Sequence, residues 1–548
     1  MRPFLILLLS IQNICFGQLL PMVEKKLPAG TTNQFLTCYD VKYYSLFLDI
    51  DPEKKHISGY NTIFFSLLNN HDTLEFYLDH RLEIDSITGQ TGTTVDFSRT
   101  NDCIRISTNI FKLPASVMPN LTVFYHGMPK TSTFPPWDGG FVWEKDVTGL
   151  DFVGVVCQLE GAQLWWPNKN DWADKPDSIT FSIQVPAGLQ AISNGILKKT
   201  DTIGQSKIRY TWFSPYPMLP YNLTVYIGNY SHFREDTSSI VDSLTLDFYV
   251  LRDHLEAAKQ HFSQVGEIIE VYEKYFGEYP FPKTGYKLVE APYLGMEHQT
   301  AIGYGNKFKN GYAGFNFAPF PFNYDYMILH ETAHEWWGNS VSVKTMNDLW
   351  ISESIATYCE SLFVENKLGY DSAASYIMSD VHHLLMNASS LSDTVNGTVY
   401  GTDLYFKGSS VWHTFRNIVN DDAKWFAFLR ELQADFRYKC ISTTELISYV
   451  NRFFKYDYTG FFDQYVYNPK IPVLEFQHET RSKTYCFKWS SCIPGFDMPL
   501  KIETQHQSFT IHPTTEWQSL PHIADLSMCM KNLNRRYLIQ TVIKTYNP

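Results

Sequence analysis

The sequence predicts a multidomain α+β protein with an N-terminal β domain, a mostly helical middle domain and a small C-terminal β-sandwich. The chain has 548 residues, several times the roughly 150 residues of one domain. Apolar residues make up 44% of the chain and aromatic residues 16%, which is enough to form several cores and excludes disorder as the main state. The hydrophobic pattern also changes near residue 253 and again near residue 470.

The first residues have the features of a secretory signal peptide over 1–17. Arg2 precedes an apolar run over 4–11, and Cys15-Phe16-Gly17 follows. This order is typical of such signals, so we expect cleavage after Gly17 and a secreted or periplasmic protein. A lipid anchor on Cys15 is the weaker alternative, because Ile14 is bulky for a lipoprotein signal. No second long apolar run follows, so we predict no transmembrane segment in the mature chain.

The N-terminal β domain is predicted over 18–252. Apolar residues alternate with polar ones from Tyr44 to Ile50, and a second apolar stretch from Ile57 to Leu67 follows a turn. This pattern predicts a hairpin. Turn residues separate further short segments of the same kind, which we expect to be strands near 121–126, 179–185, 208–213 and 222–228.

The middle domain is predicted over 253–467, because apolar residues there recur at helical spacing. We expect helices over 253–277, 325–337, 348–366 and 405–419. Strands return in the last domain, 468–548, which is long enough for one small β-sandwich. Its expected strands are 471–476, 485–489, 500–503 and 509–511.

Charge and cysteine spacing argue against two classes of function. The formal net charge is −12, from 45 basic and 57 acidic residues, and no Lys/Arg block is evident, so nucleic acid is not an expected partner. The nine cysteines are scattered without a C-x-x-C pair, so a cysteine zinc site is not expected. Cys486 and Cys492 could form a local disulfide, and free, buried cysteines are an equal alternative.

The strongest motif in the sequence is His330-Glu331-Thr332-Ala333-His334. Residues four apart lie on one face of a helix, so both imidazoles can bind one Zn²⁺ while Glu331 projects beside the metal. Asn323 and Asp325 are candidates to cap this helix. The alternative is a surface helix that carries two histidines by coincidence.

A third candidate ligand, Glu353, follows His334 at the spacing H-E-x-x-H-x18-E. It stands among apolar and small residues, where a carboxylate is costly to bury unless it is paired or bound to metal. Two His and one Glu leave the fourth position open for water, which is the catalytic arrangement. We therefore predict one zinc per chain, with Glu331 as the general base that passes a proton to the leaving amine. Asp348 and Glu335 are weak candidates for supporting the ligands.

These residues resemble the zinc aminopeptidases typified by aminopeptidase N, in the gluzincin group. That family carries a Gly-x-Met-Glu-Asn strand before the zinc helix, and the matching segment here is Leu294-Gly295-Met296-Glu297-His298. The resemblance implies that Glu297 binds the free α-amino group of the substrate, with Gly295 and Met296 beside it. Leu294 replaces the first Gly of the pattern and His298 replaces the Asn, which affects the shape of the first side-chain pocket.

Two further segments match the same family. A Tyr-x-Lys-Gly segment after the third ligand appears as Tyr405-Phe406-Lys407-Gly408, which implies that Tyr405 donates to the oxyanion; Tyr400 is its rival. A Gln-x-Glu pair in the N-terminal domain appears as Gln158-Leu159-Glu160, which implies that Gln158 and Glu160 join the amine site.

The resemblance covers most of the mature chain. It implies a β saddle, a thermolysin-like catalytic domain and a β-sandwich. Many family members end in a large helical domain that closes the cleft, and this chain has no room for it. We therefore expect a short form of the family with a more open active site.

The predicted function is that of a secreted zinc metallo-aminopeptidase, a hydrolase that removes residues from peptides with a free N-terminus. A thermolysin-like endopeptidase is the first alternative, but it would not need Glu297, Gln158 and Glu160 around an amine. An epoxide hydrolase with secondary peptidase activity is another, without a sequence feature specific to it. The last is a catalytically weak peptide-binding protein; the loss of Glu331, a zinc ligand or the tyrosine would suggest it, and all are present.

Overall fold

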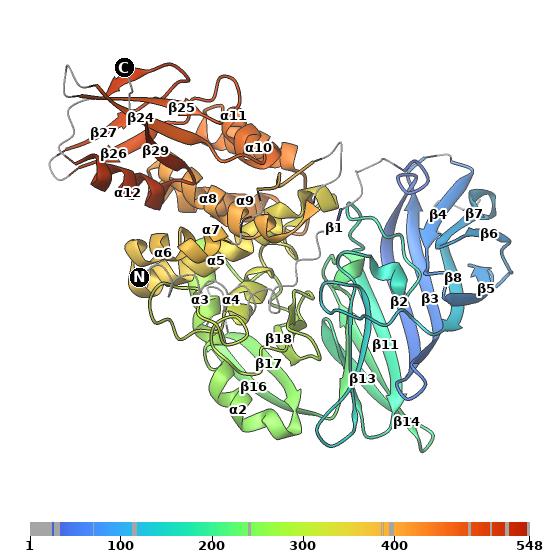
Figure 1. Ribbon diagram of the computed structural model, residues 1–548. Helices are drawn as coiled ribbons and strands as arrows, with labels where there is room; N and C mark the ends of the chain where they lie inside the picture. Colours follow the sequence, from blue (N-terminus) through green and yellow to red (C-terminus); the bar gives the residue numbers. More distant parts are fainter. Residues whose placement is uncertain are drawn as a thin grey trace.

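The computed structural model describes residues 25–26, 33–69, 71–111, 118–238, 243–384, 386, 388–393, 399–479, 484–504, 507–520 and 525–544. The predicted signal peptide, including Cys15, lies outside these ranges. Within them the chain forms a β-rich N-terminal region, a helical middle region and a C-terminal region of β-sheets, as the sequence predicts (Figure 1). None of the helices in these ranges is both long and apolar enough to cross a membrane.

The N-terminal region contains a seven-stranded sheet in the order β13-β14-β11-β2-β3-β8-β5. Its strands are β2 Tyr39–Asp51, β3 His56–Leu67, β5 Leu82–Gly89, β8 Asn120–Gly127, β11 Ser178–Pro186, β13 Ile196–Ile203 and β14 Lys207–Ser214. β2 and β3 form the predicted hairpin, in which Ile50 is paired with Ile57. Alternate side chains of β2 are buried, including Leu46 and Leu48, because successive residues of a strand point to opposite faces of the sheet.

Two smaller sheets complete the N-terminal region. One has the order β12-β15-β10-β9, with β9 Gly140–Lys145, β10 Asp151–Val156, β12 Gln190–Ser193 and β15 Val225–Gly228. The other has the order β4-β7-β6, with β4 Thr73–Tyr77, β6 Phe97–Thr100 and β7 Cys103–Ser107. The loop that follows β10 matters for function, because it carries the Gln158-Leu159-Glu160 segment.

The middle region combines one sheet with a layer of helices (Figure 1). The sheet has the order β16-β17-β18-β20-β19, with β16 Tyr230–Ser238, β17 Ser243–Leu251, β18 Tyr286–Glu290, β19 Gly295–Met296 and β20 Ile302–Tyr304. β16 and β17 precede residue 253, so this sheet begins within the segment that the sequence pattern assigns to the N-terminal domain. β19 lies at the edge of the sheet and brings Gly295 and Met296 toward the helices.

Helices form in all four predicted segments of the middle region, one of which is divided. The helices of this region are α2 Leu255–Phe262, α3 Val265–Phe276, α4 Tyr326–Ala333, α5 Trp350–Leu368, α6 Tyr370–Ile377, α7 Asp380–Leu384, α8 Phe406–Val419, α9 Asp422–Asp435, α10 Thr443–Phe454 and α11 Thr459–Phe462. Five helices of the described residues, α6, α7, α9, α10 and α11, were not predicted individually. The expected helix over 253–277 is two helices, α2 and α3. At their junction the Ser263 hydroxyl donates to the carbonyl of Gln260, a local bond that competes with helix continuation.

The C-terminal region contains a four-stranded sheet, β28-β25-β24-β29, and a two-stranded sheet, β26-β27. Its elements are β24 Val473–Glu479, β25 Thr484–Ser490, β26 Leu500–Glu503, β27 Ser508–Ile511, β28 Gln518–Leu520, α12 Leu526–Arg536 and β29 Gln540–Lys544. The sequence pattern did not predict α12. Its apolar side chains join a hydrophobic core that runs through the middle and C-terminal regions, whereas the N-terminal region has a core of its own. Cys486 and Cys492 are both free.

Candidate metal centre and active site

Helix α4 positions the two histidines of the metal motif. The side chain of Asp325 caps its N-terminus by accepting hydrogen bonds from the backbone N–H groups of Met327 and Ile328. His330 lies in the last turn of the helix, and His334 continues the helical backbone immediately after it. The two imidazoles therefore lie on one face, one turn apart, as the spacing predicts.

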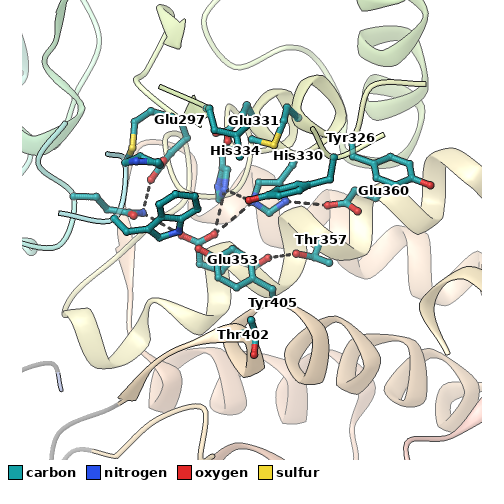
Figure 2. Close-up of a pocket in the computed structure, with 18 of the residues that line it drawn as sticks. Glu297, Tyr326, His330, Glu331, His334, Glu353, Thr357, Glu360, Thr402 and Tyr405 are labelled. Atoms are coloured by element: carbon teal, nitrogen blue, oxygen red, sulfur yellow. Dashed lines mark hydrogen bonds and ion pairs between the residues drawn. The ribbon is translucent and has the colours of Figure 1, made fainter. Parts of the chain in front are cut away.

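Three donor atoms converge at this point. The Nε2 atoms of His330 and His334 lie 3.1 Å apart, and Glu353 Oε2 lies 3.6 Å from the first and 3.4 Å from the second. Glu353 comes from the first turn of α5, which packs against α4. Figure 2 shows the three side chains pointing toward one another. The structure thus brings together the three residues predicted as ligands.

The hydrogen-bond pattern of this group fits a bound cation. His334 Nδ1 lies 2.8 Å from the carbonyl oxygen of Trp337, which can only accept, so this nitrogen carries the ring hydrogen. His330 Nδ1 faces the carboxylate of Glu360 at 3.0 Å in the same way. In the neutral rings both Nε2 atoms are then acceptors, and they face the carboxylate of Glu353. Three convergent acceptors of the types N, N and O are the donor set of a catalytic zinc site.

Sequence reasoning missed Glu360 as the residue that orients His330. Glu360 lies on α5 two turns after Glu353, and its second oxygen accepts from the hydroxyl of Tyr376. The seven-residue spacing within one predicted helix could have indicated it. The weaker candidates lie elsewhere: Asp348 accepts from Thr443, and Glu335 accepts from Thr300, Asn339 and Tyr279.

Glu331 lies beside the metal ligands in a buried position. Burial raises the pKa of this carboxyl group, the neighbouring histidines lower it, and Glu297 raises it. A Cβ atom at residue 295 would lie 2.6 Å from Glu331 Oε1, so the glycine at this position leaves room for the carboxylate. A larger residue at position 295 would therefore collide with the carboxylate of Glu331.

Glu297 and Gln158 lie next to the metal ligands on the side of His334. Gln158 Nε2 donates to Glu297 Oε1 at 2.5 Å and lies 3.1 Å from Glu353 Oε1, and Tyr221 donates to Glu297 at 3.2 Å. Burial raises the pKa of Glu297, with His334 acting in the opposite direction. The structure therefore joins the predicted amine-binding residue to the metal site through one glutamine.

Glu160 has a different environment from Glu297. Its carboxylate forms an ion pair with Lys130 at 2.7 Å, and it is not among the residues that line the cavity around the metal ligands. Glu160 thus lies near the site, but its carboxylate is already paired with Lys130. A role for Glu160 at the substrate amine stays a prediction.

The two candidate tyrosines are in contact with each other. Their hydroxyl groups lie 2.5 Å apart, and the ring of Tyr405 lies 5.8 Å from the ring of His330. Both line the cavity, and burial raises the pKa of both hydroxyl groups, so they are protonated donors at neutral pH. One tyrosine hydroxyl can therefore hold the other in position through a hydrogen bond.

Leu294 and His298, the two residues that differ from the Gly-x-Met-Glu-Asn pattern of the family, have different surroundings. Leu294 lines the cavity. His298 is fully buried behind it and hydrogen-bonds through Nδ1 to the hydroxyl of Tyr226 at 2.8 Å, and burial lowers the pKa of His298 to about 3, so it is neutral. Among the described residues no group is within hydrogen-bonding distance of its Nε2. Its contribution is to the packing behind Glu297.

The ligands open into a cavity of about 1170 Å³, including its solvent-filled mouth. Its walls come from both sides of the interface between the N-terminal and middle regions. Gln158, Leu159 and Trp137 belong to the first region, and the ligand helices α4 and α5 belong to the second. Cavities between structural regions are common sites for small ligands.

The middle region is similar to a known protein family. Residues 261–465 match the peptidase family M1 domain. Leucine aminopeptidase 2 of Lodderomyces elongisporus is 22% identical over 524 residues, which cover 85% of this chain and 75% of that protein. Aminopeptidase N of Lactococcus lactis is 28% identical over 164 residues, 27% of this chain and only 19% of that protein. The second match thus spans about a fifth of the relative's length.

The fold is also shared with solved structures. An M1 zinc metallopeptidase from Deinococcus radiodurans has a TM-score of 0.63 and 20% identity, and the match covers 76% of this chain and 91% of that one. Leukotriene A4 hydrolase from Saccharomyces cerevisiae has a TM-score of 0.64 and 18% identity, over 81% and 71% of the two chains. The overall fold is therefore the one that these two solved structures share. Residues 261–465 thus form a peptidase family M1 domain, and its His330, His334 and Glu353 form a group that could hold one zinc ion.

Proposed function

We propose that this protein is a zinc-dependent aminopeptidase that removes residues one at a time from the free N-terminus of peptides. The observation that carries the proposal is the hydrogen-bonded connection from Glu297 through Gln158 to Glu353. A buried carboxylate at that place can pair with a substrate ammonium group while the adjoining carbonyl lies at the metal. An endopeptidase would have no use for a buried anion there.

The amine end of the substrate is held by Glu297. A charge-assisted hydrogen bond between the ammonium group and this carboxylate is stronger than a neutral one. Gln158 and Tyr221 donate to the same carboxylate and fix its direction. The carbonyl carbon of the first residue is two bonds from the nitrogen, so this anchor determines which peptide bond reaches the ligands.

The proton transfers are assigned to Glu331. His330, His334 and Glu353 would hold a zinc ion, which would supply Lewis acidity for the scissile carbonyl group and for an attacking water molecule. Glu331 accepts the proton of that water as the general base. It then delivers the proton to the nitrogen of the leaving peptide. Burial favours the first of these two steps, because a raised pKa makes the Glu331 carboxylate a stronger base.

We expect Tyr405→Phe to lower kcat more than it raises KM, because a donor to the oxyanion acts mainly in the transition state. The loss should be roughly 10²–10³-fold, as for other oxyanion donors. Steady-state kinetics on a free-amine substrate measure it, and Tyr400→Phe is the matched variant. A large loss in Tyr400→Phe with a nearly unchanged Tyr405→Phe would show that Tyr400 is the donor.

The proposal is tested with a panel of aminoacyl fluorogenic amides. We expect hydrolysis that a chelator removes and added zinc restores, together with one zinc per chain by elemental analysis. His334→Ala should lose both metal and hydrolysis. A zinc-free protein that hydrolyses the panel at the same rate would contradict the proposal.

We also propose that the protein is exported. The support is the order of Arg2, the apolar run 4–11 and Gly17. Fractionation of cells that express the full chain, with N-terminal sequencing of the exported form, tests this. A chain that begins at Gln18 outside the cytoplasm is expected, and an uncleaved chain in the cytoplasm would contradict it.

A further inference from the structure

We propose that the cavity selects peptides by their second residue and favours a large apolar or aromatic side chain there. This inference rests on the proposed aminopeptidase function and specifies its substrate class. The structural basis is an aromatic pocket on the side of His330, formed by Tyr312, Phe317, Tyr326, Met327 and Phe406.

The two histidines separate this aromatic pocket from the amine-binding residues. Glu297 lies on the side of His334, where Gln158 joins it to Glu353 by hydrogen bonds to both carboxylates (Figure 2). On the other side, His330 contacts Glu360, and Tyr376 donates to Glu360 while its ring lies 5.7 Å from that of Tyr326. Figure 2 shows the same order, with Glu297 beyond His334 and Tyr326 and Glu360 beyond His330.

The direction of the substrate follows from this separation. If the ammonium group is at Glu297 and the first carbonyl is at the metal ligands, the chain after the scissile bond must continue away from Glu297. The first side chain on that side belongs to the second residue of the peptide. The aromatic pocket is therefore the place where that side chain is received.

The walls of the pocket are apolar. Tyr312 stacks on Phe317 with ring centroids 5.6 Å apart, and Phe317 lies 5.9 Å from Tyr326 and 6.4 Å from Phe406. Met327 adds a flexible thioether, which adapts to side chains of different shape. Contact with these residues removes the apolar surface of a substrate side chain from water, which makes the free energy of binding more favourable.

Three polar side chains at the pocket, Tyr326, Glu360 and Thr357, already have partners in the protein. The hydroxyl of Tyr326 bonds to Asn316 and to the backbone N–H of Ala318. The oxygens of Glu360 are used by His330 and Tyr376, and the hydroxyl of Thr357 donates to the carbonyl of Glu353. A charged side chain of the substrate would be desolvated there without a compensating partner, which is unfavourable.

The test uses peptides Ala-X-Ala-Ala in which X is Phe, Leu, Gly, Asp or Lys. Release of the first alanine by the full chain is followed by mass spectrometry, and kcat/KM is compared. We expect Phe and Leu to exceed Gly by roughly 10–100-fold, the range that hydrophobic pockets achieve, with Asp and Lys at or below Gly.

Variants identify the pocket as the cause of the preference. Phe317→Ala should reduce the ratio of kcat/KM for the Phe peptide to that for the Gly peptide by about tenfold. The matched control is Phe320→Ala, since Phe320 is a partly buried aromatic in the same loop that does not line the cavity. If Phe317→Ala does not fold, Phe406→Leu makes the same test.

The outcomes are distinguishable from those of the proposed function. Equal rates for all five peptides, or a preference unchanged in Phe317→Ala or Phe406→Leu, overturn the inference and leave the aminopeptidase proposal standing. Absence of N-terminal release from every peptide overturns the aminopeptidase proposal and the inference with it.

Discussion

Replacement of Glu331 by Gln should leave the fold and the bound zinc intact and lower kcat by roughly 10²–10⁴-fold, the contribution of a positioned general base. Gln has nearly the size of Glu and fits the space that Gly295 leaves beside the carboxylate. It cannot accept the proton of the attacking water, nor can it return one to the leaving nitrogen. The ligands His330, His334 and Glu353 are unchanged, so metal content should be unchanged as well.

Elemental analysis and steady-state kinetics on the same preparation separate these effects. Glu431→Gln is the matched control, because Glu431 is an exposed glutamate of α9 that does not line the cavity. It should behave as the unmodified protein. Turnover by Glu331→Gln within a factor of about three of that of the control would remove Glu331 from the mechanism; such a factor is under 1 kcal/mol in barrier.

Acetylation of the substrate amine should lower kcat/KM by more than about a hundredfold, which corresponds to roughly 3 kcal/mol. The neutral acetyl group leaves the buried carboxylate of Glu297 without its cation, and an unpaired buried charge is unfavourable. Glu297→Ala should therefore damage cleavage of free-amine peptides and barely affect acetylated ones. The preference for a free amine should collapse in this variant.

Glu160→Ala makes an informative comparison with Glu297→Ala. Glu160 is ion-paired with Lys130 and does not line the cavity, so we expect its loss to have the smaller effect on the preference. Both variants are assayed with one peptide in free and acetylated form. An acetylated peptide that is cleaved as fast as the free one by the unmodified protein would show that Glu297 does not select an amine.

The elements of the fold were predictable where the signal is local. The alternation in β2 and β3 and the helical spacing in α5 and α8 are properties of single segments, and the structure agrees with them. Sheet membership was not predictable, because it depends on pairing between distant segments. β16 and β17 lie within the range predicted for the N-terminal domain, yet β17 pairs in parallel with β18 of the middle region.

The site shows the same division between local and distant information. His330, His334 and Glu353 could be found because helix geometry fixes the spacing of two ligands and burial explains the third. The hydrogen bond from Gln158 to Glu297 joins residues 139 positions apart, and only the family resemblance suggested it. The ion pair of Glu160 with Lys130 and the aromatic pocket around Phe317 arise from tertiary packing, and no local pattern indicates them.

The most direct test of the central claim is a digest of one long peptide, in free and N-acetylated form, followed over time by mass spectrometry. An aminopeptidase that anchors the amine at Glu297 should produce a ladder of single-residue losses from the N-terminus of the free peptide. The acetylated peptide should remain almost intact over the same period. Early internal cuts that are equally fast in both peptides would contradict the account and indicate an endopeptidase.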